Sequence, residues 1–255
     1  KDDALAAKIA QFTKLPLLSP TAGSENGSKR GRQGSVHAVH DRSRTKHSAI
    51  YSPAGGERAV LEGGAIDVDG LGTLLTTEEC LLSDIQCRNP GFSRDDYEAV
   101  FANYLGITHT IWLGHGIAGD DTHGHVDDIT RFVAPGRVVT AVERNKKDYN
   151  HVPLHDNLKR LQKARDARGK ALDIVELPMP EPVLFEGQRL PASYANFLIT
   201  NGAVLAPVFN DPADRIALNL LAEAMPKHEI LPIYARDLVL GLGTIHCLTQ
   251  QQPVL

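Results

Sequence analysis

The feature of this sequence that most constrains its fold is a repeat of tight-turn glycines. Gly70, Gly136 and Gly202 follow one another at intervals of 66 residues. Each lies in a dipeptide that favours a tight turn, and apolar, strand-like segments flank these dipeptides. A repeat at this period predicts that one supersecondary unit is copied along the chain and that its copies pack against each other.

The segments that follow each turn indicate the same order of elements. Every hairpin is followed by a helical pattern and then by a short apolar strand. The predicted helices run from Ser93 to Gly106, through Leu158 to Gly169, and after Asp211-Pro212; the predicted strands cover residues 110–113, 174–177 and 230–233. The sequence therefore predicts an α/β fold of repeated ββαβ units. Repeats of this kind usually close into a ring that leaves no sheet edge open.

Composition divides the chain into three predicted parts. Residues 1–18 have the pattern of a helix–strand tail from an earlier unit. Residues 19–59 are rich in Ser, Gly, Arg and His without apolar periodicity, which predicts a disordered or foreign insert. Residues 60–255 contain the three units and a last half-unit that begins near Thr244, with Cys247 expected in its opening strand. This count predicts a ring that lacks its front.

Charge and cysteine usage exclude several classes of function. The formal net charge of −4 and a pI near 6.3 argue against a nucleic-acid partner. No apolar run is long enough to cross a bilayer, so we expect no membrane partner. Three cysteines are too few, and odd in number, for a disulfide framework. We therefore expect a reducing compartment, the cytoplasm.

The densest cluster of candidate functional residues lies between Gly119 and Asp128. This stretch contains two histidines and four aspartates, Asp121 among them, without a basic side chain other than histidine. It indicates a site for a cation or a metal; the alternative is a solvent-exposed acidic loop. His125 and Asp127 are two residues apart, so on a strand their side chains would share one face.

Three distant residues occupy comparable positions in the repeat and are expected to meet Asp127 at the ring axis: Glu62, Asn196 and Cys247. Cys247 follows a Gly-rich segment and, with a distant histidine, has the pattern of a cysteine nucleophile; the alternative is an inert structural cysteine. Glu62 stands between apolar residues and a double glycine, and could orient and charge His125; otherwise it is an exposed carboxylate. Cys80 and Cys87 better fit the inert interpretation.

Five motifs, in order, resemble the agmatine deiminases of the wider pentein, or peptidyl-arginine deiminase-like, group that modifies guanidines. The motifs are Leu61-Glu62-Gly63-Gly64, Trp112-Leu113, Gly124-His125-Val126-Asp127-Asp128, Ser193-Tyr194-Ala195-Asn196-Phe197 and Ile245-His246-Cys247-Leu248-Thr249-Gln250-Gln251. The resemblance implies a five-bladed α/β propeller that hydrolyses agmatine to N-carbamoylputrescine and ammonia, in polyamine biosynthesis, without a metal or organic cofactor. It leaves arginine and peptidyl-arginine open as substrates and allows for a homodimer.

The resemblance also implies roles for individual residues. Cys247 would attack the guanidinium carbon, and His125 would protonate the departing ammonia and then activate water, with Glu62 as its carboxylate partner. Asp127 would bind guanidinium nitrogens, and Asn196 and Asp121 are further candidates for substrate binding.

Three departures from the family pattern bear on activity. Leu242 and Thr244 stand where the family has Gly and Asn. Residues 19–59 match nothing in the family pattern. The family's Trp-x-Arg-Asp-x-Gly-Pro segment, whose Asp is a second guanidinium carboxylate, does not occur in these 255 residues, so the chain alone is expected to be nearly inactive.

Two rival functions follow from the same residues. Thr122-His123-Gly124-His125-Val126-Asp127-Asp128 is one residue away from the H-x-H-x-D-H zinc pattern of metallo-β-lactamase-like enzymes, which would make the chain a zinc metallo-hydrolase. A propeller remnant that binds cations or partners without turnover is the non-enzymatic alternative.

Overall fold

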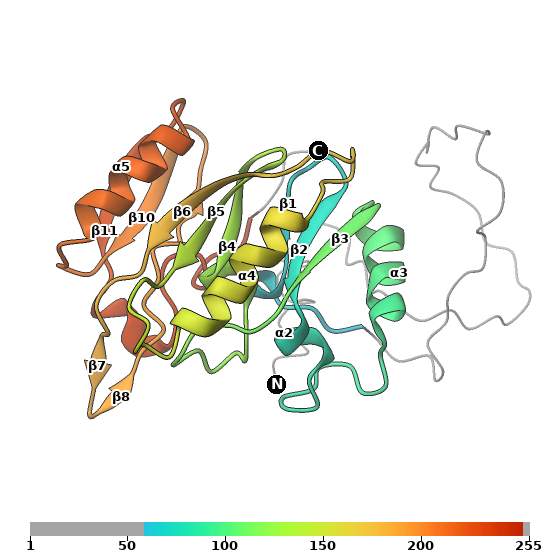
Figure 1. Cartoon of the computed structure of the whole chain (residues 1–255), viewed down its shortest axis with the longest axis horizontal. Helices are drawn as coiled ribbons and strands as arrows, with labels where there is room; N and C mark the ends of the chain where they lie inside the picture. Colours follow the sequence, from blue (N-terminus) through green and yellow to red (C-terminus); the bar gives the residue numbers. More distant parts are fainter. Residues whose placement is uncertain (1–58, 252–255) are drawn as a thin grey trace, which may run out of the picture. The chain divides into compact units, whose positions relative to one another are not determined.

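The computed structural model of the chain describes residues 59–251. Apart from Ala59, these residues belong to one compact unit, Val60–Leu255. They form three separate three-stranded sheets, in chain order and each with its own crossover helix (Figure 1). In every one of these sheets the middle strand pairs antiparallel with the strand before it and parallel with the strand after the helix. The predicted ββαβ repeat is therefore confirmed.

The first unit contains β1 (Asp67–Val68), β2 (Thr73–Thr77), α3 (Arg94–Leu105) and β3 (His109–Leu113), with the short helices η2 (Gly63–Ala65) and α2 (Glu78–Leu82). The second contains η3 (Val126–Asp128), β4 (Thr130–Ala134), β5 (Arg137–Val142), α4 (His151–Lys163) and β6 (Asp173–Pro178). The third contains β9 (Leu198–Ile199), β10 (Ala203–Val208), α5 (Asp214–Ala224) and β11 (Glu229–Tyr234). A small hairpin, β7 (Leu184–Phe185) and β8 (Gln188–Arg189), precedes the third unit, and η4 (Leu238–Gly241) follows it.

Local chemistry explains why these elements begin and end where they do. Gly70, Gly136 and Gly202 adopt φ angles of 73°, 75° and 99°, a left-handed conformation that suits glycine in hairpin turns. Ser93 and Asp96 form a reciprocal capping box at the start of α3, and Gly106 ends this helix in a left-handed C-cap. These turn and cap predictions are confirmed because they depend on neighbours in the sequence.

The predicted end of the second helix is wrong. α4 ends at Lys163, and the residues up to Gly169 form a separate small turn, closed by a bridge between Arg165 and Ala171. The Asp166 carboxylate organises this turn, because it accepts hydrogen bonds from the backbone N–H groups of Arg168 and Lys170, each at 2.9 Å. The prediction missed this local side-chain cap, which competes with helix continuation.

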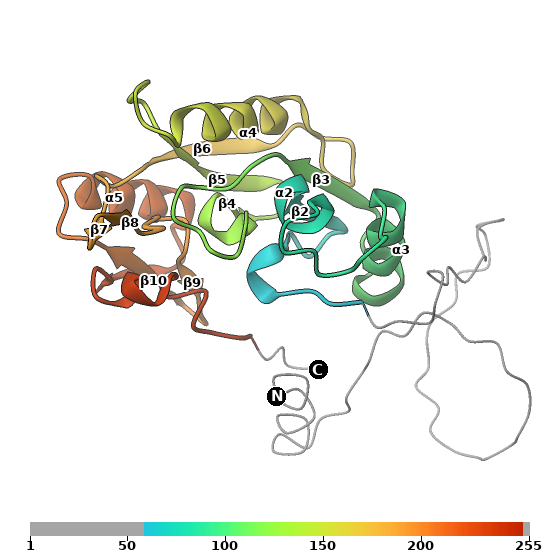
Figure 2. The ribbon, with the colours of Figure 1, turned by 90° about the horizontal axis from the view of Figure 1, so that it is seen from below.

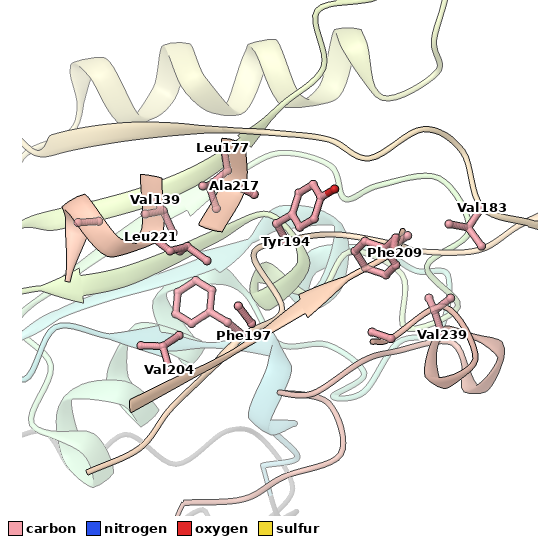
Figure 3. Packing of buried hydrophobic residues seen from close by; sticks show 14 of the residues in the cluster. Val139, Leu177, Val183, Tyr194, Phe197, Val204, Phe209, Ala217, Leu221 and Val239 are labelled. Atoms are coloured by element: carbon pink, nitrogen blue, oxygen red, sulfur yellow. The ribbon is translucent and has the colours of Figure 1, made fainter. Parts of the chain in front are cut away.

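Apolar side chains from neighbouring units share their cores. One cluster joins Val139 and Leu177 of the second sheet to Phe197, Val204 and Leu221 of the third unit (Figure 3). Another cluster joins Leu113 of β3 to Leu154 and Leu161 of α4. The helix α4, which covers its own β5 and β6 in Figure 2, also contacts β3 of the preceding unit, and α5 contacts its own β11 and β6 of the preceding unit. Each fully buried Leu or Phe contributes roughly 1.5–3 kcal/mol, so the unit interfaces are strongly held.

A buried cation ties the three units together at their inner strands. Arg131 of β4 is 4% exposed; its Nη1 donates to the Phe197 carbonyl at 2.8 Å, and its guanidinium lies 5.0 Å from the Phe197 ring centre. Its Nε is 3.3 Å from the Asp67 carboxylate of β1. Asp67 also accepts a 2.6 Å hydrogen bond from the Phe132 N–H group. The relative placement of the units therefore depends on this contact as well as on apolar packing.

The described residues answer only part of the sequence-based expectations. The α/β class is confirmed, but the three sheets do not close, and closure into a propeller stays a prediction. The parts predicted for residues 1–18 and 19–59 lie outside the described residues, apart from Ala59. None of the described helices has the length and apolar character needed to span a bilayer.

Substitution of two glycines with positive φ angles, Gly70 and Gly119, tests how much each turn contributes to stability. Gly70→Ala should lower the free energy of unfolding by about 1–2 kcal/mol, because only backbone strain is added where no atom lies within 4 Å of the new methyl group. Gly119→Ala should lower it further, because its methyl group would also overlap the Arg189 carbonyl oxygen. Urea unfolding of both variants measures the free energy of unfolding. An equal decrease in the two variants would contradict the predicted overlap at Gly119.

Candidate active site

A cavity of about 330 Å³ brings together residues that are far apart in the sequence. Four of the six predicted site residues line it, namely Glu62, Asp121, His125 and Cys247. The other two, Asp127 and Asn196, have no exposed surface and lie in contact with Cys247. Glu62 precedes η2, His125 precedes η3, and Cys247 follows η4. The cavity is thus built from loop and helix-end residues on the packed units.

His125 and Glu62 form a hydrogen-bonded pair at the cavity wall. The His125 Nε2 atom lies 2.6 Å from Glu62 Oε2. The Asp120 carboxylate fixes the backbone on the other side, since it accepts from the N–H groups of Gly124 at 2.9 Å and His125 at 3.1 Å. The side chains of His125 and Asp127 pack against Gly64, where any larger residue would clash: a Cβ atom there would lie 2.5 Å from His125 Nδ1 and 2.8 Å from an Asp127 oxygen.

This pair is charged at neutral pH. Burial lowers the pKa of His125, but hydrogen bonding with Cys80 and Glu62 and the negative charge of Asp127 outweigh it and raise the pKa to about 10. The hydrogen bond from His125 is the main cause that lowers the pKa of Glu62 to about 2; burial opposes it and Arg88 adds to it. An imidazolium and a carboxylate therefore stand at the cavity wall.

Cys247 lies in a turn at residues 245–248, so the prediction of a strand at this position is wrong. Asn196 anchors this turn. Its Oδ1 accepts from the N–H groups of His246 at 3.0 Å and Cys247 at 3.3 Å, and from the Thr244 hydroxyl at 2.9 Å. Its Nδ2 donates to the Cys247 sulfur at 3.0 Å. Thr244 therefore contributes to the anchor, although the family pattern has Asn there.

Asp127 places a buried carboxylate directly beside the Cys247 sulfur. Its Oδ2 lies 2.7 Å from His246 Nδ1 and 3.4 Å from Cys247 Sγ. Its Oδ1 has no hydrogen-bond partner among the described residues. Burial raises the pKa of Asp127, but the hydrogen bond with His246 and the charges of His246 and His125 outweigh it and lower the pKa. An ionised oxygen without a partner is suited to a ligand N–H group.

The arrangement keeps the thiol of Cys247 protonated when no cation is bound. Burial of the sulfur, and then the negative charges of Asp127 and Asp128, raise the pKa of Cys247 well above its ordinary range, against the hydrogen bond from Asn196. A cationic ligand placed against Asp127 would counter those charges and favour the thiolate. The site is therefore suited to react with cationic ligands.

The sequence predicted that His125 and Asp127 share one face of a strand, but neither residue lies in a strand. Asp127 lies in the 3-10 helix η3 and His125 is its N-cap residue, so the tight turn brings His125 Nδ1 to 4.0 Å from Asp127 Oδ1. The short polar segment forms a turn before β4 begins, and this turn decides the geometry. The pairing of the two side chains is correct, but its predicted cause is wrong.

The zinc ligand set of the rival interpretation is not assembled. Among the described residues, donor atoms with metal-compatible spacing occur in two groups, Glu62-Cys80-His125 and Asp127-Asp128-Cys247. His123 belongs to neither group, and its Nε2 lies 3.3 Å from the Ser83 hydroxyl. The two histidines of the H-x-H pattern therefore face different partners.

Sequence reasoning missed two residues of the site. His246, the neighbour of Cys247, holds Asp127, and its place inside a recognised motif was the available signal. Arg88 forms an ion pair with Glu62, with 2.9 Å between Nη2 and Oε2. It lies in a loop without any recognisable motif. Nothing in the local sequence pointed to Arg88.

Comparison with known proteins places the chain in a family. The model of the Porphyromonas-type peptidyl-arginine deiminases matches residues 1–253, and the chain belongs to this family. It is 44% identical over 215 residues to an agmatine deiminase of Stutzerimonas stutzeri, covering 77% of this chain and 58% of the relative. It is 42% identical over 212 residues to one of Pseudomonas syringae pv. tomato, covering 76% and 57%. The chain thus spans less than two thirds of the length of these relatives.

Solved structures agree with this assignment. The agmatine deiminase of Enterococcus faecalis superimposes with a TM-score of 0.71 at 38% identity, over 76% of this chain and 57% of that one. A cysteine-to-serine variant of the C. jejuni agmatine deiminase with substrate bound gives 0.67 at 33% identity, over 73% and 54%. The family resemblance and the pentein-type fold class are therefore confirmed.

Alkylation by iodoacetamide tests the electrostatics of Cys247. In a Cys87→Ser background, which removes an exposed thiol, Cys247 should react slowly at neutral pH and faster as pH rises. Asp127→Asn should accelerate the reaction about tenfold or more below the thiol pKa, because it removes a charge that raises that pKa.

The matched control is Asp121→Asn, which removes an exposed cavity carboxylate that is not among the causes of the thiol pKa shift. Peptide mass spectrometry assigns the modified cysteine. An unchanged rate in Asp127→Asn would show that this carboxylate does not hold the thiol protonated.

Proposed function

We propose that this site is that of an agmatine deiminase, which hydrolyses agmatine to N-carbamoylputrescine and ammonia. The observation that carries the proposal is the Asp127 carboxylate, whose Oδ2 lies 3.4 Å from the Cys247 sulfur and whose buried Oδ1 has no hydrogen-bond partner among the described residues. Cys247 and the His125–Glu62 pair line the adjoining cavity. A guanidinium ion supplies what these groups require, namely a planar cation with N–H donors around an electrophilic carbon. The names of the relatives support agmatine as the substrate.

Substrate binding would use the carboxylates in two places. Asp127 accepts from guanidinium N–H groups through its unpartnered oxygen, and Asp121, exposed at the cavity, adds negative charge that attracts a dication. For Asn196 we propose a role other than the predicted substrate binding, because its amide group already forms hydrogen bonds with the turn of Cys247 and with Asp128. Its proposed role is to hold Cys247 and Asp127 in register.

The first half of the reaction forms a covalent intermediate. The bound cation counters the charge of Asp127, so the Cys247 thiol releases its proton to solvent and the thiolate attacks the guanidinium carbon, forming a C–S bond. Protonated His125 donates its proton to the leaving nitrogen, the C–N bond breaks, and ammonia departs. A thiouronium remains on Cys247, which splits one difficult displacement into two easier steps.

The second half consumes water. His125, now neutral, removes a proton from water while the oxygen attacks the thiouronium carbon. The C–S bond then breaks, the remaining hydroxyl proton passes to the departing Cys247 sulfur, which returns to its resting thiol, and the C=O bond of N-carbamoylputrescine forms. His125 is again an imidazolium paired with Glu62, and proton transfer of this kind contributes roughly 10²–10⁴-fold to the rate.

The larger assembly rests on the family pattern. We infer that residues 60–255 are catalytic units of a five-bladed propeller, that residues 1–18 are the tail of an earlier unit, and that residues 19–59 are an insert. The Trp-x-Arg-Asp-x-Gly-Pro segment of the family would supply a second carboxylate to the guanidinium. The homodimer and the cytoplasmic location stay predictions.

Ammonia release from agmatine tests the proposed function. We expect little release from residues 1–255 alone. We expect clear release when residues 60–255 are joined to the N-terminal part of the Stutzerimonas relative, if that part supplies the second carboxylate of the family pattern. Cys247→Ser in the joined protein should lower the rate at least about 10³-fold, because the nucleophile is lost.

Cys80→Ser and Cys87→Ser serve as controls and should retain most of the activity. If agmatine protects Cys247 of the joined protein from iodoacetamide but no ammonia is released, the interpretation as a non-catalytic propeller remnant would be favoured. Loss of activity in EDTA, with recovery in zinc, would overturn the thiol mechanism.

The pH dependence of turnover tests the role of His125. Because the pKa of His125 is raised to about 10 in the free site, the imidazolium persists through neutral pH, and kcat/KM should fall as pH rises through that value. Glu62→Gln removes one cause of the raised pKa, so the fall should occur at lower pH. The profiles of kcat/KM against pH for both proteins provide the measurement, and superimposable alkaline limbs would remove Glu62 from this role.

A further inference from the structure

Arg88 contacts Glu62 through both carboxylate oxygens. It lies in the loop between α2 and α3, and its side chain is only 9% exposed. The Arg88 Nε atom donates to Glu62 Oε1 at 3.3 Å and Oε2 at 3.2 Å, while Nη2 donates to Oε2 at 2.9 Å. This forked contact fixes the plane of the carboxylate, which a single hydrogen bond would not do.

The remaining donors of Arg88 connect Glu62 to the loop that carries His125. Its Nη2 also donates to the Thr122 carbonyl, and its Nη1 donates to the carbonyls of Gln86 at 3.2 Å and Cys80 at 3.4 Å. Thr122 lies in the same Asp120-organised turn that fixes the His125 backbone. One guanidinium thus joins Glu62, the segment of Cys80 and Gln86, and the loop of Thr122.

Glu62 needs such support because it is partly in water. Its side chain is 40% exposed, whereas that of His125 is 9% exposed. An exposed carboxylate can rotate and exchange its partner for solvent, and the 2.6 Å contact with His125 Nε2 would then be lost for part of the time. Arg88 restricts this rotation because it donates to both carboxylate oxygens, while the imidazole donates to Oε2.

We propose that Arg88 is a positioning residue, which holds Glu62 ionised and oriented toward His125 and thereby places the proton donor of the reaction. This rests on the proposed function of the site. Arg88 does not line the cavity, so it acts through Glu62 and not on a bound ligand. Its guanidinium is already engaged by Glu62 and three carbonyls, which leaves it unsuited to bind a substrate carboxylate.

The test combines an equilibrium measurement with kinetics. Arg88→Met keeps much of the aliphatic stem but removes the cation, and Arg88→Lys keeps the charge but not the fork. In ¹³C NMR titrations of the full chain without substrate, the proton affinity of the Glu62 carboxylate should rise about tenfold in Arg88→Met. In Arg88→Lys it should stay near that of the unsubstituted protein.

For turnover we expect a loss in kcat with little change in KM. In the joined protein, kcat should fall about 10–100-fold in Arg88→Met and by a smaller factor in Arg88→Lys, with KM changed less than about threefold, because proton transfer is impaired and binding is not. Arg160→Met is the matched control, since Arg160 also pairs with two carboxylates, Glu78 and Asp156, but contacts no site residue. It should change neither kcat nor the Glu62 titration.

The outcomes separate this inference from the proposed function. If no protein releases ammonia but Arg88→Met alone shifts the Glu62 titration, the positioning contact stands and the proposed function fails. If turnover occurs and Arg88→Met retains both the Glu62 titration and kcat, the positioning role is wrong. Arg88→Lys keeps the question decidable if Arg88→Met does not fold, because a kcat equal to that of the unsubstituted protein would also overturn the role of the fork.

Discussion

The burial of one negative charge, that of Asp127, governs the structure of this site. A carboxylate removed from water is costly unless it is paired and hydrogen-bonded. Here His246 donates a 2.7 Å hydrogen bond and the His125 imidazolium lies at 4.0 Å, so the pKa of Asp127 stays low although the residue has no exposed surface. One oxygen is left without a hydrogen-bond partner among residues 59–251, and such an oxygen is suited to a ligand N–H group.

The partners of Asp127 come from different parts of the chain, so the charge is compensated only when the units are packed. His246 and Cys247 follow the third unit, and Asn196, which precedes β9, holds their turn. The shared apolar clusters and the Arg131 contact with Asp67 and Phe197 set the distance between these segments. Stability of the unit interfaces and the geometry of the site are therefore the same physical problem.

The same charge also contributes to keeping the Cys247 thiol protonated. Cys247 is exposed, yet burial of its sulfur and two adjacent carboxylates raise the pKa of its thiol. A protonated thiol is poorly reactive toward neutral electrophiles, and it would become reactive when a bound cation offsets the carboxylates. In the proposed reaction, charge pairing in the free site would contribute to selectivity as well as to binding, and the His125–Glu62 pair would keep the proposed proton donor charged.

The sequence alone determined those features that depend on neighbouring residues or on the repeat. The hairpin glycines at 70, 136 and 202, the capping box at Ser93 and the ββαβ order follow from local conformational preference. The convergence of Glu62, His125, Asp127 and Cys247 could be predicted because equivalent positions of repeated units meet.

Only the tertiary structure decided four features of the site. These are the turn that holds Cys247, the hydrogen bonds by which Asn196 anchors it, the hydrogen bond from His246 to Asp127, and the ion pair of Arg88 with Glu62. Their hydrogen bonds, except those within one turn, join residues 26 to 119 positions apart, and local propensity carries no information on such contacts.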